Sequence, residues 1–133
     1  MKFVYGKQDW KTFERGEENC FLMTNGLGGF SSLTMIGSCG RNDHAVLMAC
    51  VHSPNHRYNM IHRLEESLFI GEEEVHLSSQ DYLDEAREQG FLYQTKFTYE
   101  DYPRWTYLVK GIEIVRTMVL SQGENSVGIS YEI

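Results

Sequence analysis

Residues 105–120 read WTYLVKGIEIVRTMVL and show the pattern that decides the fold. Apolar residues recur there with period two or in short runs, and many of them are β-branched or aromatic, as is typical of β-strands. Two such runs, residues 105–109 and 112–120, flank Lys110-Gly111, a spacing that suits a β-hairpin. The segment therefore predicts two antiparallel strands joined by a tight turn.

The same strand signals recur along the rest of the chain, bounded by glycine or polar residues. Residues 45–51 are apolar on both faces, as in a strand in the middle of a packed sheet. Gly71 separates two further runs in a second hairpin. The other predicted strands are residues 20–24, 30–36, 58–70 and 74–77. A third turn is predicted at residues 122–125. We therefore expect an all-β fold, an antiparallel β-sandwich of the supersandwich kind.

Two segments depart from this regular picture. Residues 81–90 contain helix formers and end at Gly90, which predicts a short surface helix. The second segment is residues 126–133, in which apolar and polar or small residues alternate, the pattern of a half-buried strand. The apolar positions are Val127, Ile129, Tyr131 and Ile133. The chain stops inside that strand. We expect residues 1–133 to form a single β-sandwich domain, the incomplete front part of a larger one, whose open strand edges pair with another copy.

Composition narrows the classes of function. The 133 residues, with 41% hydrophobic side chains, suffice for one folded domain and exclude both disorder and a large two-domain enzyme. Twelve Lys and Arg against 19 Asp and Glu give a net charge of −7, which excludes nucleic acid and anionic membranes as partners. The N-terminus has no apolar signal-peptide core, the longest apolar run is too short to cross a bilayer, and three cysteines without a Cys-x-x-Cys pair indicate a reducing, cytoplasmic compartment.

The glycine cluster at residues 25–30 partly resembles loops that bind anions through their backbone amides. It lacks the lysine of a phosphate-binding loop and the third glycine of a dinucleotide fingerprint, so a tight turn or bulge is favoured. Such a loop also allows close approach to a sugar ring. The five histidines show no repeated ligand spacing, and Cys50 with His52 is a single pair. We name no metal ligands and expect no cofactor.

Acidic residues could hydrolyse a glycosidic bond, and aromatic residues could stack on a sugar ring. Glycoside hydrolysis needs two carboxylates facing one bond, whereas Glu65 and Glu66 would point to opposite faces of a strand. Residues 72–74 fit a solvated acidic edge better. No catalytic residue is assigned. Trp105, which follows Pro103-Arg104 at a loop-to-strand boundary, is the aromatic residue selected for stacking on a sugar, against the alternative of core packing.

Several motifs together resemble a known family. Residues 21–32, FLMTNGLGGFSS, closely resemble the Leu-x-Thr-Asn-Gly-Leu-Gly-Gly-Phe/Tyr-Ala-Ser signature of bacterial and archaeal glycogen debranching enzymes. Residues 41–47 resemble the Arg-Arg-Tyr-His-Gly-Leu-Leu stretch and keep Arg41, His44 and Leu47, whereas Asn42, Asp43 and Ala45 differ. The remaining matches are residues 64–66 to Leu-x-Glu, 103–107 to Pro-x-Trp-x-Tyr, and 123–132 to the Gly-x-Asn-x-Val…Tyr ending.

The resemblance implies the N-terminal β-sandwich of an amylo-α-1,6-glucosidase, a glycoside hydrolase of carbohydrate metabolism. In that family a catalytic (α/α)₆ barrel follows and carries the catalytic carboxylates, so this chain is expected to be non-catalytic. The expected partners are that barrel and α-glucan, as glycogen or malto-oligosaccharide. The candidate substrate or interface contacts are Asn25, Gly26, Gly28, Gly29, Arg41, His44 and Trp105. A second hypothesis is a free-standing carbohydrate-binding or oligomerising β-module without a catalytic partner.

Overall fold

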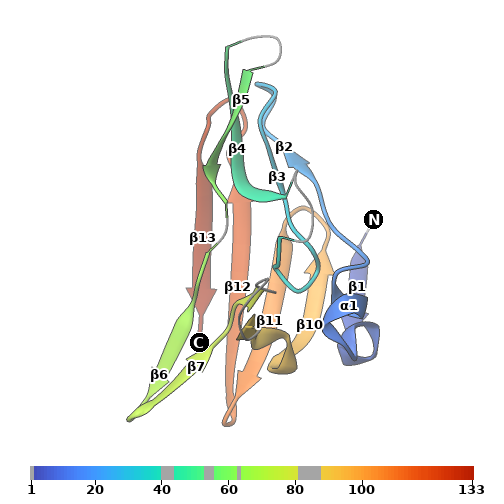
Figure 1. Cartoon of the computed structure of the whole chain (residues 1–133), viewed down its shortest axis with the longest axis vertical. Coiled ribbons are helices and arrows are strands. Elements are labelled where there is room, and N and C mark those ends of the chain that lie inside the picture. The colour runs from blue at the N-terminus through green and yellow to red at the C-terminus, as the bar shows by residue number, and fades with distance from the viewer. Residues whose placement is uncertain (1, 40–43, 53–55, 63, 81–87) are drawn as a thin grey trace.

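The computed structural model describes residues 2–39, 44–52, 56–62, 64–80 and 88–133 and has two main antiparallel sheets (Figure 1). The larger sheet has the strand order β1, β10, β11, β12, β13 and the smaller one β2, β3, β4, β5. The larger sheet comprises β1 (Phe3–Gly6), β10 (Gln94–Tyr99), β11 (Pro103–Val109), β12 (Ile112–Leu120) and β13 (Val127–Glu132). The smaller sheet comprises β2 (Met23–Thr24), β3 (Phe30–Ser32), β4 (Ala45–His52) and β5 (His56–Ile61). The expected all-β sandwich is confirmed.

Short elements complete the described part of the chain. Two small hairpins pair β6 (Ser67–Ile70) with β7 (Glu73–His76) and β8 (Ser79–Gln80) with β9 (Glu88–Gln89). The helical turns are η1 (Lys7–Trp10), α1 (Phe13–Gly16) and η2 (Gly90–Leu92). None of the helices in these described ranges is long and apolar enough to cross a membrane.

The β11–β12 hairpin forms where the sequence predicts it. Val109 pairs with Ile112 and Trp105 with Arg116, in a regular antiparallel register. The two residues between the strands have positive φ, 51° at Lys110 and 80° at Gly111. Positive φ at both central residues gives the turn twist that matches the twist of the flanking strands. Val127–Glu132 likewise forms the predicted C-terminal strand, which pairs with β12 and lies at one edge of the sheet.

Three of the predicted strands are longer than the strands in the structure. The strand expected at residues 30–36 ends at Ser32, because the Thr34 hydroxyl accepts from the Ser38 amide at 3.0 Å and closes a turn with Gly37 at φ +80°. Of residues 20–24 only β2 forms, and Cys20 joins Thr34 in an isolated bridge. The run 58–70 divides into β5 and β6.

The helix expected at residues 81–90 falls largely outside the described residues. Residues 81–87 are not described, whereas 88–89 form β9 and Gly90 begins η2. The described end of this segment is therefore a strand and a helical turn. A Cβ on Gly90 would lie 2.0 Å from the carbonyl oxygen of Leu77, so the turn packs directly on the neighbouring backbone.

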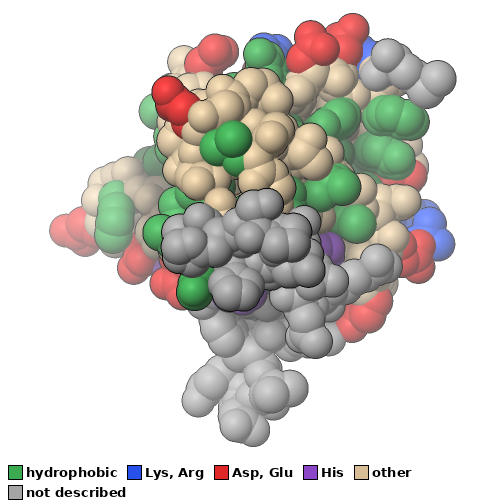
Figure 2. All heavy atoms as spheres, turned by 90° about the horizontal axis from the view of Figure 1, so that it is seen from above, with side chains coloured by type: hydrophobic (Ala, Val, Ile, Leu, Met, Phe, Trp, Pro, Cys, Tyr) green, Lys and Arg blue, Asp and Glu red, His purple; other side chains and the backbone are tan. Residues whose placement is uncertain are grey.

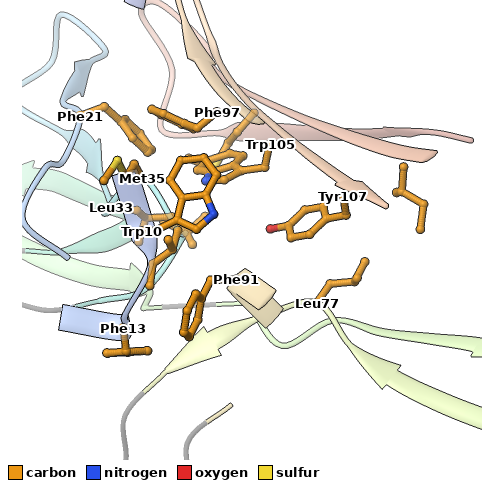
Figure 3. Close-up of a cluster of buried hydrophobic side chains, with 14 of the residues drawn as sticks. Trp10, Phe13, Phe21, Leu33, Met35, Leu77, Phe91, Phe97, Trp105 and Tyr107 are labelled. Atoms are coloured by element: carbon orange, nitrogen blue, oxygen red, sulfur yellow. The ribbon is translucent and has the colours of Figure 1, made fainter. Parts of the chain in front are cut away.

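Aromatic side chains fill the space between the two sheets (Figure 3). The Phe21 ring lies 5.6 Å from that of Trp105 and 6.2 Å from that of Phe97, which joins the β2 side of the sandwich to β10 and β11. The Trp10 indole donates to the Gln94 carbonyl at 3.3 Å, which anchors η1 on the same core. Buried aromatic residues of this size dominate core energetics. They fix how the two sheets face each other.

A cation lies inside this core. The Arg116 guanidinium is 4.2 Å from the centroid of the Trp105 ring and is paired with Glu66, whose other carboxylate oxygen accepts from the Tyr131 hydroxyl. Arg116 exposes 7% of its surface. Burial lowers the pKa of Arg116 to about 10, which still leaves it charged at neutral pH. The network therefore ties the segment before β6 to β12 and β13.

Replacing Arg116 by Met is expected to lower the free energy of unfolding by about 3–5 kcal/mol, because it leaves the Glu66 carboxylate without its buried partner. Urea denaturation followed by tryptophan fluorescence measures the loss. Arg104→Met is the matched control, since Arg104 is exposed on the adjacent strand. Equal effects of the two substitutions would contradict a structural role for the ion pair.

Candidate functional site

The loop that carries the glycine motif joins β2 to β3 at the upper end of the molecule in Figure 1. Asn25, the first residue of the loop, is completely buried. Its side-chain oxygen accepts from the Leu27 amide at 2.9 Å and from the Gly29 amide at 3.1 Å. The backbone N–H of Asn25 donates in turn to the Gly29 carbonyl at 3.3 Å. The side chain therefore closes the loop from inside.

The same side chain also joins the loop to the other sheet. Its amide nitrogen donates to the Glu124 carbonyl at 3.2 Å and to the side-chain oxygen of Asn125 at 2.9 Å, both in the turn between β12 and β13. The Gly123 amide donates to the Asn25 carbonyl at 2.7 Å. Two donors and two acceptor positions exhaust the capacity of a carboxamide. Asn25 is therefore a structural link between the sheets and has no group left for a substrate contact.

The glycines are required by the loop geometry. Gly26 and Gly28 have φ values of 82° and 86°, which side chains disfavour. Gly29 has an ordinary φ, but a Cβ there would lie 2.7 Å from the Asn25 amide nitrogen and 2.7 Å from the Met48 carbonyl oxygen. The Leu27 and Gly29 amides are already bonded to Asn25, so they cannot form an anion cradle. The predicted turn is therefore the better interpretation.

The tip of the loop is the part that faces outward. Gly26, Leu27 and Gly28 are exposed, with 46% of the Leu27 surface accessible. A neighbouring molecule or domain would meet one apolar side chain and backbone that glycine leaves uncovered. This tip keeps Gly26 and Gly28 as contact candidates, whereas the buried Asn25 and Gly29 support it.

The other predicted contact residues do not gather around this loop tip. Trp105 has no exposed surface, because it lies in the core beneath Arg116, so the prediction that it stacks on a sugar is wrong and core packing is correct. His44 is buried, with 3% of its surface exposed, directly before β4. Arg41 lies outside the described residues.

Glu65 and Glu66 do not form a carboxylate pair that faces one bond. Glu65 is exposed, whereas Glu66 binds Arg116 and Tyr131. Across the described ranges no group of three or more His, Cys, Asp or Glu side chains is placed to hold a metal ion.

A groove beside the loop was missed by the sequence reasoning. It has a volume of about 420 Å³, and its walls come from β2, the β10–β11 connection and the end of β12. Its lining includes Leu22, Thr24, Tyr99, Asp101, Tyr102 and Gln122. The available signal was the adjacent Asp101-Tyr102 pair in a loop between two strands, because polar and aromatic residues together in a loop are typical of binding surfaces. The other walls of the groove come from residues 22–24 and 119–122, which are far from Asp101 and Tyr102 in the sequence.

Asn25→Asp is expected to lower the free energy of unfolding by about 2–4 kcal/mol, since the carboxylate keeps the shape but loses both donors and faces two acceptor oxygens. Thermal and urea unfolding measure this loss. Asn19→Asp is the control, because Asn19 is exposed and its side chain has no hydrogen bond among the described residues. A stability loss no larger than that of the control would contradict the role of the Asn25 amide.

A family model described as "Glycogen debranching enzyme N terminal" matches residues 19–133, a range that includes the loop, its partner turn and the groove walls. Comparisons with curated proteins and with solved structures gave no significant match. The matched range covers most of the chain and starts just before β2. The chain belongs to the family of glycogen debranching enzyme N-terminal domains.

Proposed function

We propose that the chain is a non-catalytic accessory domain that supports hydrolysis of α-1,6 branch linkages in glycogen by a catalytic (α/α)₆ barrel. The observation that carries this proposal is the loop at residues 25–29, which the core amide of Asn25 holds in one shape while its tip stays exposed. A contact surface that is already ordered loses little conformational entropy when it binds. Such a loop suits a permanent interface with the barrel.

The chemistry of the exposed tip fits an interface better than a reaction site. Leu27 provides apolar contact area, and the two flanking glycines let another backbone approach closely. Neither Leu27 nor a glycine can transfer a proton or form a covalent intermediate. In this proposal the catalytic carboxylates belong to the barrel.

Glu66 supports the same division of labour. Both oxygens of its carboxylate are bonded, one to Arg116 and the other to Tyr131. A general acid or nucleophile in glycoside hydrolysis needs a carboxylate directed at the scissile bond and a second one about 5–10 Å away. Glu66 serves the fold instead.

The proposed compartment is the cytoplasm. Cys20, Cys39 and Cys50 lie in the described residues as thiols. Reduced thiols are the ordinary state of cysteine in the cytosol, where glycogen would be the available substrate.

A second candidate function is a free-standing module that binds carbohydrate or assembles with copies of itself. The open edges of the larger sheet favour it, since β1 and β13 each pair on one side within the described sheets. Tyr131 on β13 exposes 49% of its surface. An edge strand of this kind is able to pair with a second chain.

The decisive experiment is native immunoprecipitation from source cells with an antibody against this chain. The precipitate is analysed on a denaturing gel and assayed for glucose release from limit dextrin. We expect the antibody to recognise, or to bring down, a polypeptide several times heavier than 15.5 kDa, together with glucose release. A 15.5 kDa band alone without glucose release would contradict the accessory role. Light scattering would then test the assembly of the free-standing module.

A further inference from the structure

Two hollows of about 220 and 420 Å³ lie on the side of the molecule that carries β1, β2 and β10. They share the lining residues Leu22 and Tyr99, and we call them together the Tyr99 groove. Hydrophobic side chains gather on the right-hand side of Figure 2, the side on which β1 and β2 lie in Figure 1. The larger hollow falls within the 300–1,000 Å³ usual for small-molecule sites.

The lining of the Tyr99 groove combines apolar faces with polar groups. Tyr102 exposes 45% of its surface, Phe3 47% and Leu22 60%, and Tyr99 is half-buried between them. Asn19 lines the smaller hollow, and Thr24, Asp101, Ser121 and Gln122 line the larger one. Aromatic surface together with a few polar side chains is the usual composition of a site for an amphipathic ligand.

The groove walls are held in place by contacts that do not use their ligand-facing groups. The Tyr99 ring stacks on Phe21 at 5.9 Å with an interplanar angle of 29°, and its hydroxyl donates to the Leu22 carbonyl at 3.4 Å. The Gln122 side-chain nitrogen donates to the Thr24 carbonyl, which joins β2 to the end of β12. The Gln122 side-chain oxygen has no hydrogen bond among the described residues, and neither has the Asp101 carboxylate.

We propose that the Tyr99 groove binds a linear α-glucan chain. The apolar face of a pyranose ring packs on an aromatic ring, and its hydroxyls donate to acceptors such as the Asp101 carboxylate and the Gln122 side-chain oxygen. A neutral polymer also suits a chain of net charge −7, which would repel anionic ligands. This inference rests on the proposed function, because membership in a debranching-enzyme family supplies the choice of glucan.

The position of the groove fits that role. Thr24 directly precedes Asn25, and Gln122 directly precedes Gly123, so the groove begins where the loop and its partner turn are linked. Glucan held in the groove would therefore lie at the end of the domain that we assign to the barrel interface. A second segment of the same polymer could occupy the barrel, and linked binding events raise the effective local concentration of substrate.

Isothermal titration of the full chain with maltoheptaose tests this proposal. We expect saturable binding, and we expect Tyr102→Ala to weaken it roughly three- to tenfold through loss of the ring contact. Asp101→Asn is expected to weaken binding as well, because it replaces a charged acceptor by a neutral group. Tyr58→Ala is the matched control, since Tyr58 is a 50% exposed tyrosine on β5 and does not line the groove.

Two results would overturn the groove as a glucan site. One is the absence of saturable maltoheptaose binding, and the other is binding that Tyr102→Ala and Tyr58→Ala change equally. Failure here is distinguishable from failure of the accessory role. An active, larger immunoprecipitated species without maltoheptaose binding by this chain would retain the accessory role and remove the groove, whereas Tyr102-dependent binding without a larger species would retain the groove and support the free-standing module.

Discussion

The end of the molecule that carries the β2–β3 loop depends on the four hydrogen bonds made by the buried side chain of Asn25. Two of them close the loop between β2 and β3, and the other two reach the turn between β12 and β13. A buried carboxamide that lost these partners would carry the full cost of its desolvation. The loop and the turn are therefore stable only together, and the exposed tip and the adjacent groove inherit their shape from this link.

A second polar link acts deeper in the sandwich. Arg116 stacks on Trp105 and binds Glu66, which also accepts from Tyr131. Breaking a buried pair of this kind is costly because one charge is left uncompensated, even where the pair itself adds little stability over apolar packing. The two links hold different connections, one between β2 and β3 and one before β6. Together they attach irregular segments of the chain to the larger sheet, which leaves the aromatic core to set the sheet spacing.

The hairpin at residues 105–120 was predictable because its pattern and its turn residues are local, and the Asn-Gly-Leu-Gly-Gly motif identified the family. Long-range features were not predictable. The partners of Asn25 lie about 100 residues away, so its saturation is invisible in a local pattern. Trp105 follows a loop, yet the core covers it. The end of β3 at Ser32 depends on the Thr34–Ser38 hydrogen bonds, which override strand propensity.

The loop at residues 25–29 is ordered by the core before any partner binds. Native-state hydrogen exchange of the Leu27 and Gly29 amides, both bonded to Asn25, tests it most directly. We predict exchange roughly a hundredfold or more slower than that of the Gly71 amide, which lies in an open turn. Exchange of Leu27 and Gly29 as fast as that of Gly71 would show a loosely held loop and contradict the account.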